Sequence, residues 1–214
     1  MKKKYNKRYL EIYAMLTLSK YLNLDLDIEN LKERPDLQSK ELDIGIEVTQ
    51  AITEQDGLYN ALYQQYFGKG YKSKYIKKMI LKNKRFTGQI YEIDGKVYIA
   101  PSDETINADS YLEKLENSIF KKLRKLTQGY TLFSSNCLYL YTNTYLLKPE
   151  DIYRFFSKLN TSEFKLQFDI YYINCIDKIY LFNKNNHNFK EYDINIKDLP
   201  LIRKKALKLS KKFN

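Results

Sequence analysis

Residues 34–52 read RPDLQSKELDIGIEVTQAI, and this stretch decides the expected fold. Two short apolar runs, RPDLQ and DIGIEVTQ, flank the polar turn SKEL, and this pattern predicts two antiparallel strands joined as a hairpin. Each run carries an acid in an unusual place. Asp36 directly follows Pro35, and Glu47 lies in the middle of a strand that otherwise has the composition of a buried one.

The two acids are predicted to meet and to share a metal ion. Alternation along the second run places Ile44, Ile46 and Val48 on one face and Glu47 on the other, so Asp36 and Glu47 can meet on adjacent strands. Two adjacent carboxylates repel each other unless a cation lies between them. Oxygen ligands of this kind bind a hard divalent ion, so we expect Asp36 and Glu47 to hold Mg²⁺ or Mn²⁺. The small Gly45 is expected to let another backbone or a substrate strand come near. The alternative is that both acids lie on the exposed face of the hairpin and pair with lysines.

The rest of the chain predicts a mixed α/β fold. Helical spacing or capping predicts helices over about 6–22, from near 49 to 67, 74–84, 110–127, 148–160 and 198–214. Strands are predicted over 89–101 as a hairpin around Asp94-Gly95, over 130–143, and over 168–182 with a turn near 176–177, whereas 183–189 are expected to form a loop. This order predicts a central sheet with helices packed on it. We expect one domain over residues 1–214, with a core of about 5–145 and a C-terminal strand and basic helix extension of about 146–214.

Composition indicates a protein with a polyanionic partner. The 214 residues carry a formal net charge of +11, with a pI near 9.3. Nucleic acid and anionic membrane surfaces both match such a charge. The charged N-terminus and the lack of a long apolar run predict a cytoplasmic protein without a transmembrane segment. Cys137 and Cys175 lie in strand-like runs and are expected to be buried, reduced thiols.

A basic stretch is the candidate nucleic-acid contact. Residues 69–85 hold eight basic and no acidic residues, interleaved with Tyr71 and Tyr75. Lysines suit phosphate contacts, and tyrosine rings suit occasional stacking on bases. The predicted contact residues are Lys69, Lys72, Lys74, Lys77, Lys78 and Arg85. The C-terminal run RKKALKLSKK is equally basic, and a membrane-surface helix has the same appearance.

A helix bearing a glutamate, followed by PD and then by the strand GIEVT, resembles the PD-(D/E)XK nuclease superfamily. The resemblance covers roughly residues 5–130 and rests mainly on ERPDLQ and IGIEVTQA. It implies a restriction-endonuclease-like fold, a mixed sheet flanked by helices, and Mg²⁺-dependent hydrolysis of phosphodiesters. On this resemblance Asp36 matches the motif aspartate, Glu47 the second acid, and Glu11 the helical glutamate found in many members.

The chain departs from the family pattern at one position. Thr49 stands where the motif has a lysine that helps to orient or activate water. Some members supply this lysine from a neighbouring element, and Lys122, at the margin of the apolar face of helix 110–127, is the leading candidate, with Lys125 as the alternative. The expected function is therefore a metal-dependent nuclease, with DNA as the expected partner. Two alternatives stay open: a non-catalytic nucleic-acid-binding protein on a degenerate nuclease scaffold, and a protein- or membrane-surface interaction module.

Overall fold

The computed structural model describes residues 7–52, 54–67, 70–100 and 107–213. The chain divides into two compact units. The main unit comprises Met1–Ala51 and Leu115–Asn214, and the insert unit comprises Ile52–Lys114. The strands on the two sides of residue 145, where the sequence predicts an extension to begin, pair with each other within the main unit.

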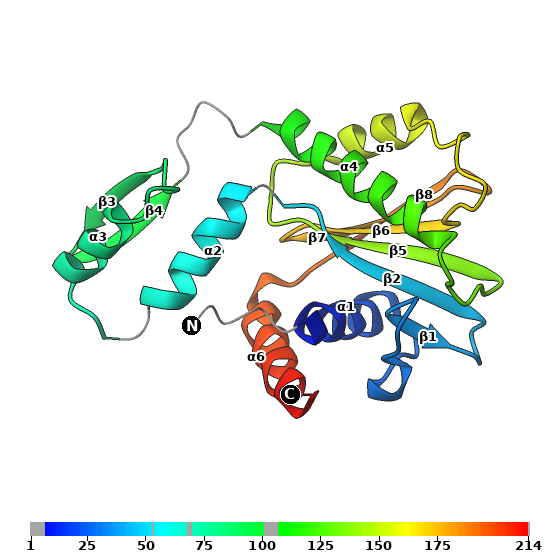
Figure 1. The fold of residues 1–214 in the computed structure, drawn as a ribbon, viewed down its shortest axis with the longest axis horizontal. Coiled ribbons are helices and arrows are strands. Elements are labelled where there is room, and N and C mark those ends of the chain that lie inside the picture. Colours follow the sequence, from blue (N-terminus) through cyan, green and yellow to red (C-terminus); the bar gives the residue numbers. More distant parts are fainter. Residues whose placement is uncertain (1–6, 53, 68–69, 101–106, 214) are drawn as a thin grey trace. The chain divides into compact units, whose positions relative to one another are not determined.

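The main unit is built on a mixed six-stranded sheet, which confirms the predicted mixed α/β class (Figure 1). Its strands, in spatial order, are β1 (Leu37–Ser39), β2 (Ile44–Gln50), β5 (Ser135–Tyr141), β6 (Ile170–Asn174), β7 (Lys178–Asn183) and β8 (Asn188–Asp193). Strands β2, β5 and β6 run parallel, while β1, β7 and β8 pair antiparallel with their neighbours. The predicted 34–50 hairpin is therefore present at one edge of the sheet.

Two strand predictions needed correction. Strand β8 begins at Asn188, inside the stretch 183–189 that the sequence predicted to be a loop. This outer strand is mostly exposed and polar, so it lacks the apolar pattern of a buried strand. Strand β5 begins at Ser135, because residues 130–134 form a loop in which the side chain of Asn136 accepts a hydrogen bond from the Phe133 amide at 3.1 Å.

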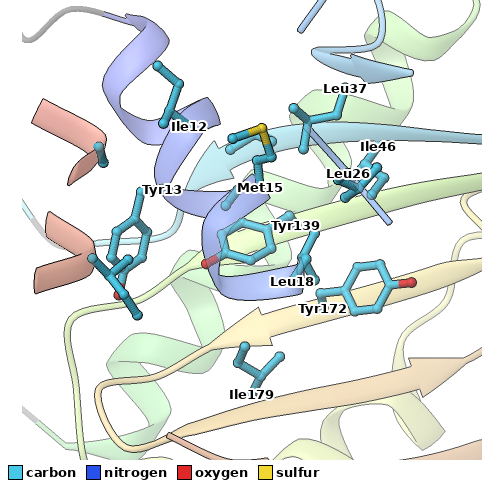
Figure 2. Close-up of a cluster of buried hydrophobic side chains, with 14 of the residues drawn as sticks. Ile12, Tyr13, Met15, Leu18, Leu26, Leu37, Ile46, Tyr139, Tyr172 and Ile179 are labelled. Carbon is cyan, nitrogen blue, oxygen red and sulfur yellow. The ribbon is translucent and has the colours of Figure 1, made fainter. Parts of the chain in front are cut away.

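Helices cover both faces of the sheet. Helices α1 (Lys7–Leu22) and α6 (Leu199–Ser210) lie on one face, and α4 (Ala108–Leu126) and α5 (Pro149–Lys158) lie on the other (Figure 1). Figure 2 shows side chains of α1 packed against strand residues such as Ile46, Tyr139 and Tyr172. On the opposite face Leu115, Ile119 and Leu123 of α4 are completely buried. Strand β2 is therefore enclosed on both sides, so the alternative of an exposed hairpin face is wrong.

The insert unit forms its own small core. It contains α2 (Glu54–Tyr66), α3 (Ser73–Leu81), the hairpin β3 (Gln89–Ile93) and β4 (Lys96–Ala100), and the first residues of α4. The predicted turn at Asp94-Gly95 is confirmed, and both residues have positive φ, of 50° and 70°. Helix α2 begins at Glu54 and not near Thr49, because β2 continues to pair with β5 as far as Gln50.

The structure also bears on the two cysteines and on the expected absence of a transmembrane segment. Cys137 and Cys175 are free and buried, as predicted. No helix in the described part of the chain has both the length and the apolar character needed to cross a membrane.

Candidate functional site

Asp36 and Glu47 lie together, each buried. Leu37 pairs with Ile46, and one further step in this antiparallel register brings Asp36 opposite Glu47. The Val48 amide donates a 2.9 Å hydrogen bond to Oδ2 of Asp36, which fixes the aspartate against β2. The two residues are only 2% and 4% exposed. The predicted meeting of the two acids is therefore present.

Lys122 of α4 reaches this pair. Its ammonium group donates a hydrogen bond to Oε1 of Glu47 and a second, of 3.2 Å, to the Val48 carbonyl. One turn earlier, the Ser118 hydroxyl donates to the Gln50 carbonyl at 3.1 Å. The face of α4 that carries Lys122 therefore also hydrogen-bonds to the last residue of β2. Lys122, at the margin of the apolar face of this helix, therefore points towards β2.

The acids and Lys122 line a cavity of about 410 Å³ within the main unit. Its other lining residues are Glu33, Arg34, Lys125, Gln128 and Tyr130. A backbone hydrogen bond connects the loop after α4 with the segment before β1: the Thr131 amide donates to the Arg34 carbonyl at 3.1 Å. Neither Arg34 nor Lys125 forms an ion pair with a carboxylate in the described part of the chain. The cavity thus combines buried acids with two cations available to an anion.

The sequence does not predict four of the lining residues as site residues: Glu33, Arg34, Gln128 and Tyr130. Arg34 directly precedes the Pro35-Asp36 dipeptide, so its nearness to the motif was a usable signal. The sequence predicts a strand at Tyr130, and nothing in the local pattern indicates that residues 130–134 instead form a loop at the cavity. The sequence predicts Lys125 only as the alternative to Lys122.

The electrostatics of the cavity are dominated by Glu47. Burial raises the pKa of Glu47, and the charge of Asp36 raises it further, whereas Lys122 and Tyr130 oppose the change. Its Oε2 atom is buried and accepts no hydrogen bond from the described residues. Burial and then the charge of Glu47 raise the pKa of Tyr130, so this hydroxyl stays protonated and can donate a hydrogen bond.

Glu11 lies outside the cavity lining. Its Oε2 accepts a 2.8 Å hydrogen bond from Arg8, with which it forms an ion pair. The same arginine donates to the Lys32 carbonyl at 2.9 Å and to Glu33 at 3.1 Å. Through Arg8, Glu11 is therefore linked to the segment that leads to Asp36.

Gly45 has a packing role that differs from the prediction. A Cβ atom at this position would lie 2.6 Å from Cδ2 of Phe133 and 2.8 Å from Cγ of Pro35. The space beside Gly45 is therefore filled by two side chains of the protein and is not open to a substrate strand. Close packing of Pro35 on this glycine positions the following residue, Asp36.

The donor set matches a divalent cation of the magnesium type. Within the described residues no three His, Cys, Asp or Glu side chains group in a way that could hold a metal. Mg²⁺, however, commonly uses one or two carboxylates together with water and phosphate oxygens. Asp36, the unpaired Oε2 of Glu47 and the Val48 carbonyl are oxygen donors of this kind. The residues present therefore fit Mg²⁺ or Mn²⁺.

The predicted basic track lies in the insert unit. Lys72, Lys74, Lys78 and Arg85 are exposed. Lys77 instead forms an ion pair with Glu92 of β3. Lys69 lies outside the described residues.

Comparison of the chain with protein-family models, curated proteins and solved structures found no match.

Proposed function

We propose that this protein is a metal-dependent nuclease that hydrolyses nucleic-acid phosphodiesters, with DNA as the expected substrate, on a restriction-endonuclease-like fold. The observation that carries the proposal is the hydrogen bond between Lys122 and Glu47 beside the buried Asp36. Two acids and one lysine, from β2, α4 and the segment just before β1, converge on one cavity. This is the set of groups that the motif resemblance implies, with the lysine moved from position 49 to helix α4.

The position of the lysine favours a catalytic protein over a degenerate scaffold. A scaffold that had lost its chemistry with the motif lysine would have no need to place another ammonium group on the same carboxylate. Burial of Lys122 is also costly unless its charge is compensated, and its side chain is only 14% exposed. The Glu47 carboxylate compensates the charge of Lys122. Because Lys122 also lines the cavity, its ammonium group can reach a bound substrate.

Each residue then has a distinct role. Asp36, Glu47 and the Val48 carbonyl would hold the metal ion, which when bound polarises a phosphate and lowers the pKa of a bound water. Lys122 orients a water molecule or stabilises negative charge that develops on the phosphate.

The opposite part of the cavity supplies substrate contacts. Arg34 and Lys125 are cations without a described carboxylate partner, so they can bind phosphate oxygens. The protonated Tyr130 hydroxyl can donate a further hydrogen bond to the same anion.

A cleavage assay tests the proposal. Single- and double-stranded DNA and RNA are incubated with Mg²⁺ or Mn²⁺, and with EDTA as the blank. Asp36→Asn, Glu47→Gln and Lys122→Gln should each lower the cleavage rate about 100-fold or more, the usual scale for loss of a preorganised group that stabilises developing charge, directly or through a metal ion. Lys121→Gln and Arg124→Gln, on the exposed face of the same helix, are matched controls and should keep the wild-type rate.

Two results would count against the proposal. Absence of metal-dependent cleavage on all four substrates would remove the enzymatic function and favour the non-catalytic nucleic-acid-binding protein. Cleavage that survives in both Asp36→Asn and Glu47→Gln would indicate a contaminating activity or another site.

A further inference from the structure

We infer that the exposed face of the β3–β4 hairpin is a stacking platform for single-stranded nucleic acid. The platform is formed by Tyr91 and Tyr98, with Ile93 and Lys96 beside them. It lies wholly within the insert unit and is a binding surface additional to the cavity of the proposed function.

Strand register places the two tyrosine rings next to each other. Tyr91 pairs directly with Tyr98, so both side chains project from the same face of the hairpin. Ile93 and Lys96 form the next pair on this face. The tyrosines are 43% and 42% exposed, and Ile93 is 59% exposed.

The opposite face of the hairpin is already used for packing. Val97 and Ile99 are buried in the insert core with Ile76 and Ile80 of α3. The outer face is therefore not needed to stabilise the unit, yet it carries aromatic and aliphatic side chains. The Tyr91 hydroxyl also hydrogen-bonds to Gln89 on the same face, which restrains the ring before any ligand binds.

The positive charge of the insert unit indicates that the ligand of this platform is nucleic acid. Residues 69–85 of the same unit hold eight basic and no acidic residues. Of the two acids in the hairpin, Glu92 is paired with Lys77, and Asp94 lies in the turn. Lys96 supplies a cation on the ring face itself, and exposed rings beside a cation, without acids on the same face, are the combination that binds a sugar-phosphate strand and stacks on its bases.

A second exposed aromatic pair supports the same ligand. The rings of Tyr71 and Tyr75 lie with centroids 5.1 Å apart and are 49% and 44% exposed. Both residues belong to the basic stretch. Stacking on side chains requires bases whose faces are free, and a duplex keeps its bases stacked on each other. We therefore assign the platform to single strands and not to duplexes.

Fluorescence anisotropy with a labelled oligothymidylate of about 12 nucleotides tests this assignment. EDTA is present, so binding is measured without metal-dependent cleavage. Tyr91→Ala/Tyr98→Ala should weaken binding about 10-fold or more, because the variant lacks both rings on which bases stack. Tyr91→Phe/Tyr98→Phe keeps both rings and should bind within about 3-fold of wild type.

The matched control is Tyr145→Ala/Tyr153→Ala, which removes two tyrosines of the main unit that are 57% and 52% exposed. This variant should bind like wild type. Circular dichroism of all variants establishes that they are folded. Equal affinity of wild type and the folded Tyr91→Ala/Tyr98→Ala variant for the oligonucleotide would overturn the inference.

Other occupants give different results. A loss of affinity for duplex DNA or for phosphatidylserine vesicles, with single-strand binding unchanged, would overturn the single-strand assignment. So would a wild-type dimer, seen by sedimentation, that dissociates in the Tyr91→Ala/Tyr98→Ala variant without any effect on oligonucleotide binding.

The inference and the proposed function fail separately. Wild-type protein that binds through the tyrosine pair but cleaves nothing would contradict the nuclease and support the platform. Protein that cleaves single strands equally well, and binds them equally well, with and without the tyrosine pair would support the nuclease and contradict the platform.

Discussion

The ammonium group of Lys122 hydrogen-bonds to the carboxylate of Glu47 across a sequence separation of 75 residues. The contact requires α4 to pack on the face of β2 that carries Glu47, and three completely buried α4 residues, Leu115, Ile119 and Leu123, provide that packing. A cation that the strand lacks at Thr49 is thus supplied by a helix.

Moving the lysine should restore part of the activity. Lys122→Thr should abolish most cleavage, whereas Lys122→Thr combined with Thr49→Lys should recover at least about 10-fold of the lost rate, because Thr49 and Glu47 share one face of β2. The measurement is kcat with a metal ion at saturation. A Thr49→Lys variant in the wild-type background controls for effects of position 49 alone. Full activity of Lys122→Thr would show that this lysine has no catalytic role.

Metal should stabilise the folded protein through the acid pair. A ligand that binds only the folded state adds about 2.7 kcal/mol when its concentration is 100 times its Kd. Thermal melts with increasing Mg²⁺ or Mn²⁺ should therefore show a rising Tm in wild type and a constant Tm in Asp36→Asn and Glu47→Gln. A parallel rise in Tm for all three proteins would place metal binding elsewhere.

The stability of the metal-free protein should fall with rising pH because of Glu47. The pKa of Glu47 is raised in the folded state, so its favourable contribution is fully present below its ordinary value of 4.5 and is lost as the pH rises through the raised pKa. Glu47→Gln removes this titration. Urea unfolding in EDTA should show the variant gaining stability relative to wild type as the pH rises from 4.5. If the difference in unfolding free energy between wild type and Glu47→Gln stays constant with pH, the pKa of Glu47 is not raised in the folded state.

Mg²⁺ should reverse this trend in wild type. The ion binds the ionised carboxylates, so its stabilising effect should increase over the same pH window. The same unfolding series, repeated with Mg²⁺, measures this increase.

Gly45→Ala should destabilise the main unit. The added Cβ would overlap Phe133 and Pro35, and overpacking of this kind costs about 1–3 kcal/mol. Because Pro35 directly precedes Asp36, the metal-dependent rise in Tm should also diminish. The control is Gly57→Ala in α2, where among the described residues a Cβ would meet only Ile52, at 3.9 Å, and where alanine favours the helix by up to about 1 kcal/mol. Chemical denaturation of the two variants compares them directly.

The salt dependence of nucleic-acid binding should report on the insert unit. Lys74→Gln/Lys78→Gln removes two exposed cations and should reduce the slope of log K against log salt concentration by about 1.4 for single strands. Lys77→Gln should have a smaller effect, because this lysine is paired with Glu92. Lys158→Gln/Lys165→Gln removes two exposed lysines of the main unit and serves as the control. An equal change in slope for both double variants would assign the binding to overall charge.

Local sequence patterns were sufficient for most helices and strands and for the meeting of Asp36 with Glu47. Alternation and the SKEL turn specify the β1–β2 register, and helical periodicity alone indicates that Lys122 points towards the apolar side of α4. These features depend on residues close together in the chain. The outer strand β8 was not predicted, because most of its residues are exposed and its sequence therefore lacks the apolar alternation that indicates a strand.

The cavity itself depends on contacts between segments far apart in the chain. Arg34 and Tyr130 line one cavity because the loop after α4 hydrogen-bonds to the segment before β1, and no local periodicity specifies that contact. Likewise, Gly45 is enclosed by Phe133, and Glu11 is paired with Arg8 outside the cavity lining. Each of these outcomes depends on how helices and loops pack on the two faces of the sheet. Packing is decided by the shapes and charges of side chains that meet only after the chain has folded.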